Sequence, residues 1–84
     1  MMTEAQIYEK LTVLFQDIFD DDHLTIHADT TAGDVAGWDS FNHINLIVSA
    51  EAAFGIKIQS AEIEELQNVG QFVKLIHHRL AAKG

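Results

Sequence analysis

The stretch Gly37-Trp38-Asp39-Ser40-Phe41, followed by apolar residues at helical spacing as far as Phe54, decides the fold. Asp39 comes just before this run, and its side chain can accept a hydrogen bond from a free backbone N–H of the first helical turn. Ser40 would then lie at the exposed start of the helix, beside the positive end of its dipole, where a negatively charged group is well placed. The spacing therefore predicts a helix over residues 40–54 with Ser40 at its entrance.

The surroundings of Ser40 in the sequence do not look catalytic. A serine hydroxyl is a weak nucleophile unless a base activates it. The Gly-x-Ser-x-Gly turn of many hydrolases is missing, because position 42 is Asn. His43 lies three residues after Ser40, but no Asp or Glu on that helix is spaced to orient the imidazole. We therefore expect Ser40 to be modified, and we expect the protein not to be an enzyme.

Length and composition predict one small domain over residues 1–84. Hydrophobic residues make up 48% of the chain and charged residues 21%, a balance typical of a folded domain and not of a disordered tail. The chain has no proline and only five glycines, which suits a helical bundle. Because it has no cysteine, we expect neither disulfides nor thiolate metal sites, and no other metal site is indicated.

The charge balance limits the classes of partner. The net charge is −8, whereas nucleic acids and anionic membranes are bound through Lys and Arg. We therefore expect no nucleic acid, no membrane insertion and partners with basic surfaces. No apolar run approaches the roughly 20 residues of a transmembrane helix, and the first residues lack the basic-then-apolar order of a signal peptide. A cytoplasmic monomer is the expectation.

A first helix is predicted over residues 4–19. Thr3 and Gln6 have the spacing of a capping box, and the apolar residues after them recur every three or four positions. Residues 20–38 lose this period and are rich in Asp. Because that length is unusual for a structureless loop, we expect it to pack through four apolar side chains: Leu24, Ile26, Val35 and Trp38. The spacing of its acids does not fit a calcium-binding EF-hand loop.

Three signals place the elements after the second helix. Gly55 is a helix terminator, and Ile56-Lys57-Ile58 reads as a packed connector. Ser60 can cap a short third helix over residues 61–66, and a second capping-box spacing, at positions 68 and 71, opens a last helix to about Ala82. Its expected core residues are Phe72, Val73, Leu75, Ile76 and Leu80. The predicted fold is all-α, a mainly antiparallel four-helix bundle with a long first loop and a short third helix.

The second helix has more apolar surface than one core face needs. At about 100° per residue, its two apolar stripes are Leu46, Ile47, Ala50 and Phe54 on one side, and Phe41, Ile44 and Val48 beside it. The latter stripe begins next to Ser40. It either packs inside the bundle or forms a surface for partners or for a bound chain, and the pattern alone leaves both open.

The residues around Ser40 resemble those of a known family. Asp39-Ser40-Phe41, then Ile44, Leu46, Ile47 and Glu51, then Phe54-Gly55-Ile56-Lys57-Ile58, resemble the phosphopantetheine attachment region of acyl carrier proteins. The resemblance covers nearly the whole chain, because length, acidity and the order of the later helices match as well. It implies the four-helix fold of that family. It also implies that Ser40 is esterified by 4′-phosphopantetheine from coenzyme A, whose thiol carries an acyl group as a thioester.

The resemblance further implies the partners and the surface that meets them. A phosphopantetheinyl transferase would modify Ser40, and acyl-loading and acyl-transferring enzymes would dock through basic or apolar patches. Asp39 would assist modification and docking. The other recognition residues would be Phe41, Ile44 and Val48 for apolar contacts and Asn45 and Glu51 for polar contacts.

The charges of this chain depart from the family pattern. Fatty-acid carriers of the family have a strongly acidic helix after the serine, whereas here that helix contains only Glu51. Residues 1–39 contain nine acidic residues and one basic residue, and residues 40–84 contain four of each. Lost acids weaken electrostatic steering more than they exclude binding. We therefore expect dedicated partners in a specialised lipid, polyketide, peptide or sugar-acylation pathway.

Other functions remain open on the sequence alone. A carrier of aminoacyl groups, of the peptidyl carrier type, would have the same attachment serine. An unmodified helical interaction module would use the broad apolar surface of the second helix for protein binding. A serine enzyme would need a base and an oxyanion site beside Ser40, and a chain this short leaves little room for a substrate cleft.

Overall fold

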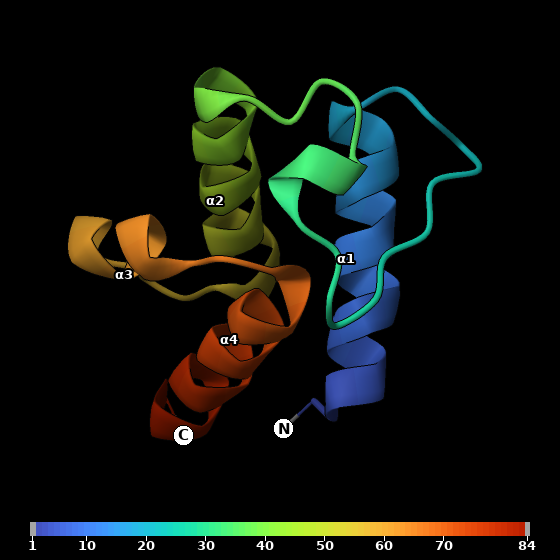
Figure 1. Cartoon of the computed structure of the whole chain (residues 1–84). Helices are drawn as coiled ribbons and strands as arrows, with labels where there is room; N and C mark the ends of the chain where they lie inside the picture. Colours follow the sequence, from blue (N-terminus) through green and yellow to red (C-terminus); the bar gives the residue numbers. More distant parts are fainter. Residues whose placement is uncertain (1, 84) are drawn as a thin grey trace.

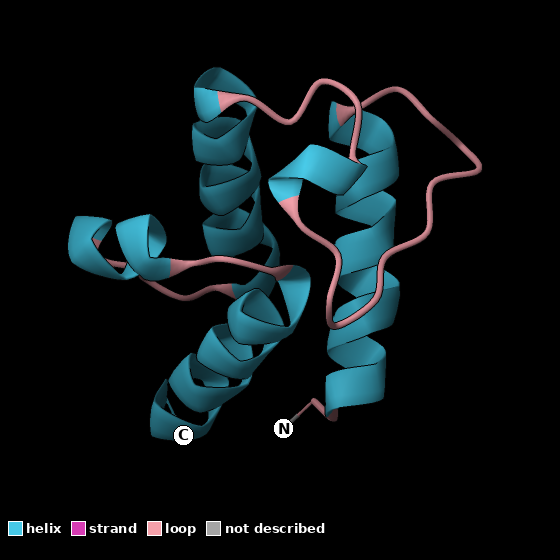
Figure 2. Cartoon of the chain, in the orientation of Figure 1, coloured by secondary structure: helices cyan, strands magenta, loops and turns pink. Residues whose placement is uncertain are grey.

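The computed structural model of the chain describes residues 2–83, apart from the side chains at positions 60, 63, 64 and 83. Within these residues all regular elements are helical (Figures 1 and 2). Their order is α1 (Glu4–Ile18), the short 3₁₀ turn η1 (Ala32–Asp34), α2 (Ser40–Phe54), α3 (Ser60–Glu65) and α4 (Val69–Lys83). The prediction of an all-α, four-helix fold with a short third helix is confirmed, and η1 is an addition that the sequence pattern did not predict.

The core lies where α1 meets α2 and α4. Helix α1 contributes Ile7, Leu11 and Phe15, all fully buried. Each large apolar side chain removed from water in this way stabilises the fold by about 1.5–3 kcal/mol. The side chains that surround these three are Leu46, Ile47, Ala50 and Phe54 of α2 and Val69, Phe72, Val73 and Ile76 of α4. The predicted core stripe of the second helix is therefore confirmed, whereas Leu75 and Leu80 of α4 are only half-buried.

The ends of α1 and α2 follow the local signals in the sequence. The backbone N–H of Gln6 donates to Thr3 Oγ1 (3.2 Å), and the Thr3 N–H donates to Gln6 Oε1 (2.9 Å), so the capping box is confirmed. Helix α2 ends at Gly55, whose φ of 66° is left-handed. Glycine adopts this conformation without the steric cost that a Cβ would add.

The loop between α1 and α2 is packed and fastened. Ile26 and Val35 are buried and Leu24 and Trp38 half-buried, as predicted. Figure 1 shows the loop, in teal and green, running alongside α1 before it reaches the start of α2. The backbone N–H of Val69 donates to the Thr30 carbonyl (2.9 Å), and the next N–H, of residue 70, donates to the carbonyl of residue 28 (2.8 Å). These bonds satisfy N–H groups that the start of α4 would otherwise leave free.

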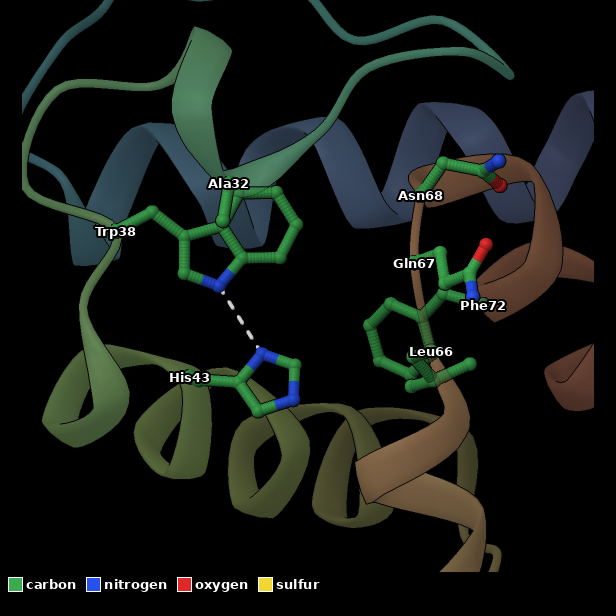
Figure 3. Close-up of a pocket in the computed structure, with 7 residues that line it drawn as sticks. All are labelled: Ala32, Trp38, His43, Leu66, Gln67, Asn68 and Phe72. Carbon is green, nitrogen blue, oxygen red and sulfur yellow. Dashed lines mark hydrogen bonds between the residues drawn. The ribbon is translucent and has the colours of Figure 1, made fainter.

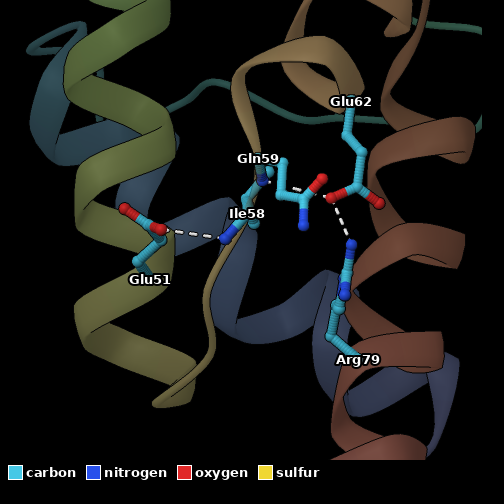
Figure 4. Close-up of polar contacts among 5 residues, drawn as sticks. All are labelled: Glu51, Ile58, Gln59, Glu62 and Arg79. Atoms are coloured by element: carbon cyan, nitrogen blue, oxygen red, sulfur yellow. Dashed lines mark hydrogen bonds and ion pairs between the residues drawn. The ribbon is translucent and has the colours of Figure 1, made fainter.

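The short helix α3 lies to one side of the bundle and is joined to α4 by a Glu62–Arg79 ion pair (Figures 1 and 4). It begins at Ser60, one residue before the predicted start. The expected cap by the Ser60 side chain and the expected core position of Ile63 lie outside the described side chains. At the start of α4, Asn68 Oδ1 accepts from the N–H of residue 71 (2.8 Å), as the capping spacing predicted. In the described part of the chain, no helix combines the length and the apolar character that a membrane crossing requires.

Candidate functional site

Ser40 lies at the start of α2, in a turn that several hydrogen bonds hold in place. Asp39 Oδ1 accepts from the N–H of Asn42 (2.9 Å), and the Asp39 carbonyl accepts from the N–H of His43 (2.8 Å). Asn42 Nδ2 donates back to the carbonyl of Gly37 (2.8 Å). The cap predicted for Asp39 is therefore confirmed, and the loop before Ser40 is tied to the helical turn after it.

The Ser40 side chain is exposed at this helix start. Among the described side chains, no hydrogen bond involves the Ser40 hydroxyl, and His43 is paired with another residue. His43 Nδ1 accepts a hydrogen bond from Trp38 Nε1–H (3.0 Å), and the two rings stack with their centroids 6.0 Å apart (Figure 3). Among the side chains that the structure describes, no base is therefore hydrogen-bonded to the hydroxyl. An accessible hydroxyl beside the positive end of a helix is suited to receive a phosphoryl group from a modifying enzyme.

A groove adjoins Ser40, and a smaller cavity shares part of the groove's wall. The groove has a volume of about 650 Å³ and is lined by Ala32, Trp38, Asp39, Ser40, His43, Ile44 and Leu66. Next to it lies a cavity of about 50 Å³, drawn in Figure 3, whose wall adds Gln67, Asn68 and Phe72. The open groove gives a long flexible group attached at Ser40 a surface to lie on, so the residues present fit a phosphopantetheine arm.

The apolar stripe of α2 that the sequence left undecided is exposed. The exposed fractions are 74% for Phe41, 53% for Ile44 and 57% for Val48. Ile44 also lines the groove beside Ser40. Exposed large apolar side chains grouped on one helix face mark an interaction surface more often than isolated ones do.

The two predicted polar recognition residues differ in whether their side chains are bonded within the chain. Asn45 is exposed, and its Nδ2 lies 3.5 Å from Asn42 Oδ1, at the outer limit of a hydrogen bond. Glu51 is engaged within the chain, because its Oε2 accepts from the backbone N–H of Ile58 (2.9 Å, Figure 4). Asn45 therefore lies open to partners beside the apolar stripe, whereas the Glu51 carboxylate fixes the connector after α2.

Among the carboxylates that the structure describes, Glu62 on α3 has a perturbed pKa. Its hydrogen bond from Arg79, then one from the Gln59 backbone N–H (3.1 Å), lowers the pKa of Glu62 below the ordinary glutamate value (Figure 4). This pair is structural, because it joins α3 to α4 and lies away from Ser40. Among the described residues, His, Asp and Glu side chains do not gather as metal ligands would.

Sequence reasoning missed the inner wall of the site. Leu66, which follows α3, and Phe72 of α4 face Trp38 and His43 across the cavity (Figure 3). The spacing of five residues between Trp38 and His43 is no helical signal, because Trp38 precedes α2. Their contact depends on how the preceding loop folds, so only the tertiary structure reveals it.

Comparison with known proteins agrees with this geometry. Residues 9–76 match the family model described as the phosphopantetheine attachment site. The acyl carrier protein of Lactobacillus johnsonii is 31% identical, over 89% of this chain and 94% of its own length. The solution structure of a holo acyl carrier protein from Geobacter metallireducens matches with a TM-score of 0.85 and 41% identity, covering 90% of this chain and 87% of that one.

A second solved structure supports the fold. The acyl carrier protein of Thermotoga maritima superposes with a TM-score of 0.85 at 20% identity, covering 96% of this chain and 94% of that one. The family model matches most of the chain, and the holo structure is 41% identical to the chain over the region that the two share. By fold, by the residues around the helix start and by sequence similarity, this chain belongs to the acyl carrier proteins, which carry acyl groups on a 4′-phosphopantetheine prosthetic group.

Proposed function

We propose that Ser40 is the residue that bears the 4′-phosphopantetheine and that the protein acts as a carrier without catalysing a reaction of its own. The observation that supports this most directly is an exposed hydroxyl without a base, held at a capped helix start beside a groove of about 650 Å³. The bound group supplies a thiol, which the chain lacks because it has no cysteine. Tethering the cargo in this way raises its effective concentration at each partner enzyme.

The chain's own residues present the arm. Asp39 caps α2 and so fixes the position of the Ser40 hydroxyl. Asn42 ties the first turn to the Gly37 carbonyl, which limits movement of the loop that precedes the serine. The groove residues beside Ser40 then offer an apolar surface to the arm.

The same proposal covers the partners. A phosphopantetheinyl transferase and the acyl-handling enzymes would meet α2 through Phe41, Ile44 and Val48, with Asp39, Asn45 and Glu51 around them. The monomer would be the working form, with this exposed stripe free for one enzyme at a time.

The charge on α2 favours dedicated partners. Glu51 is the only acidic residue of α2, and its carboxylate is bonded within the chain. Docking would therefore rest on apolar contacts more than on charge, which fits a specialised pathway better than bulk fatty-acid synthesis. Efficient loading and elongation by a housekeeping set of fatty-acid enzymes at ordinary salt would contradict this part of the proposal.

Intact mass tests the attachment residue. The chain is incubated with coenzyme A, magnesium and a broad-specificity phosphopantetheinyl transferase, beside Ser40→Ala and, as a matched control on the same helix, Ser49→Ala. We expect the wild type and Ser49→Ala to gain the mass of one phosphopantetheine and Ser40→Ala to gain none. Circular dichroism confirms that each variant is folded. A folded wild-type chain that gains nothing, beside a working control carrier, would overturn the proposal in favour of an unmodified interaction module.

A further inference from the structure

The groove beside Ser40 and the inner cavity meet at a shared set of side chains. Both are lined by Ala32, Trp38, His43 and Leu66. The hydrogen-bonded rings of Trp38 and His43 therefore border both spaces (Figure 3). The cavity measures about 50 Å³. Since one water-sized group needs roughly 10–15 Å³, only a few non-hydrogen atoms fit.

The bond between the two rings fixes the tautomer of His43. Its Nδ1 accepts the indole N–H and so carries no proton, and a neutral imidazole then carries its proton on Nε2. In Figure 3 this second nitrogen lies on the side of the ring away from Trp38. In the backbone and side chains that the structure describes, no acceptor is bonded to it. His43, which lines both the groove and the cavity, therefore presents a hydrogen-bond donor in fixed orientation on the side of its ring away from Trp38.

The rest of the wall combines apolar and polar residues. Leu66 and Phe72 give apolar contacts, and Gln67 and Asn68 also line the cavity, with their amide groups drawn away from Trp38 and His43 in Figure 3. Asn68 Oδ1 caps α4. An alkyl group placed against His43 would displace water from the Nε2–H donor without forming a hydrogen bond to it, at a cost of about 1–3 kcal/mol.

We propose that this carrier holds a short acyl group bearing a hydroxyl or keto oxygen, and that His43 Nε2–H, held in place by Trp38, donates the hydrogen bond that recognises this oxygen. The inference rests on the attachment of the arm to Ser40. His43 is then a specificity-determining residue of the carrier, and Trp38 is the positioning residue that fixes the direction of its donor.

Three cargoes test the inference. The chain without its arm is loaded by a broad-specificity phosphopantetheinyl transferase from butyryl-, 3-hydroxybutyryl- or octanoyl-coenzyme A, and intact mass verifies loading first. A failure of Ser40 attachment therefore shows as an unchanged mass and is separate from a failure of cargo recognition. The readouts are the NMR resonances of the Trp38 indole and the His43 ring, and the rate of thioester hydrolysis. We expect the 3-hydroxybutyryl group to shift both ring signals and to be hydrolysed about three- to tenfold more slowly than butyryl.

Variants separate the donor from the shape of the pocket. His43→Phe keeps a ring but removes the donor, and we expect it to abolish the difference between the two short cargoes. His43→Gln supplies an amide donor and should restore part of the difference. His78→Phe, at an exposed histidine of α4, is the control and should leave the difference unchanged.

Three results would overturn the inference. One is equal protection of butyryl and 3-hydroxybutyryl in the wild type, or an equal difference in folded His43→Phe. Another is stronger protection of octanoyl than of either short cargo, which would indicate a purely apolar site. The third is a shift of the His43 signals on attachment of the arm alone with no further change on acylation, because His43 would then recognise the arm itself.

Discussion

Trp38 connects the core to the site. Its ring meets Phe15 edge-on with centroids 5.2 Å apart and lies at a tilt against Phe19 at 6.2 Å, and its N–H reaches His43. Aromatic pairs in such arrangements contribute about 0.5–1.5 kcal/mol beyond their buried area. One side chain thus joins α1, the loop before Ser40 and the first turn of α2, so the geometry at Ser40 depends on core packing.

Gly70 allows the loop between α1 and α2 to approach the start of α4 closely. A Cβ there would lie 2.7 Å from the carbonyl oxygen of Ala28, which also accepts the Gly70 N–H. Although alanine gains up to about 1 kcal/mol of helix propensity over glycine, forcing the two backbones apart costs more. We expect Gly70→Ala to lower the free energy of unfolding by about 1–2 kcal/mol, measured by urea denaturation.

Gly33→Ala is the matched control for that prediction. A Cβ at Gly33 would meet only Thr31 Oγ1, at 3.7 Å, which is ordinary contact. We expect its free energy of unfolding to change by less than about 0.5 kcal/mol. If the two substitutions changed the free energy of unfolding equally, the close approach of the loop to α4 would not be what makes a side chain at position 70 costly.

Single residues were predictable where their partners lie close in sequence. The Thr3 capping box and the Asp39 cap each join positions three apart, so the pattern of residue types reveals them. The contact of Gly70 with Ala28 and the bond between Trp38 and His43 were not predicted. Both depend on the path of the loop, which is set by packing and leaves no period in the sequence.

Helix α2 shows that local signals predict where an element begins and ends, whereas tertiary packing decides which of its faces are buried. Its observed bounds, Ser40–Phe54, equal the predicted ones because a capping Asp precedes it and a left-handed glycine ends it. Its core stripe was predicted by the helical period. The period could not decide between burial and exposure for Phe41, Ile44 and Val48, because that depends on whether another element covers them, and in the structure they are exposed.

The attachment of α3 to α4 gives a prediction for acid stability. The pKa of Glu62 is lowered, first by its hydrogen bond from Arg79, so the ionised form is favoured in the folded protein. The pair therefore stabilises the fold fully above the ordinary glutamate pKa of 4.5, and the contribution is lost as pH falls through the lower folded value. We expect Glu62→Gln to be less stable than the wild type at neutral pH and the difference to shrink on acidification, measured by urea denaturation across pH 3–7.

Glu65→Gln, at an exposed position of the same helix, is the comparison. This variant should lose as much stability on acidification as the wild type does, because the Glu62–Arg79 pair is intact. A stability difference between Glu62→Gln and the wild type that stays constant over the whole pH range would show that ionisation of Glu62 does not stabilise the fold.

Over the whole molecule, charge and apolar surface are separated. Nine of the thirteen acidic residues precede Ser40, whereas the surface beside Ser40 on α2 is apolar. Exposed acids within about 10 Å steer basic partners, and salt screens them beyond that distance. The acidic loop can therefore attract a partner while Phe41, Ile44 and Val48 form the contact that holds it.

Alanine substitutions at Phe41 and Val13 can distinguish an effect on partner binding from an effect on folding. Phe41 is 74% exposed beside Ser40, and Val13 is 55% exposed on α1 and is not among the residues that line the groove or the cavity. Because neither side chain is in the core, we expect Phe41→Ala and Val13→Ala each to change the free energy of unfolding by less than about 0.5 kcal/mol. Truncating an apolar contact at the centre of an interface costs about 1–2 kcal/mol, so kcat/KM for phosphopantetheinylation should fall about tenfold in Phe41→Ala. Val13→Ala should be modified at the wild-type rate. Equal rates for both variants would mean that the modifying enzyme approaches Ser40 from the loop and not along α2.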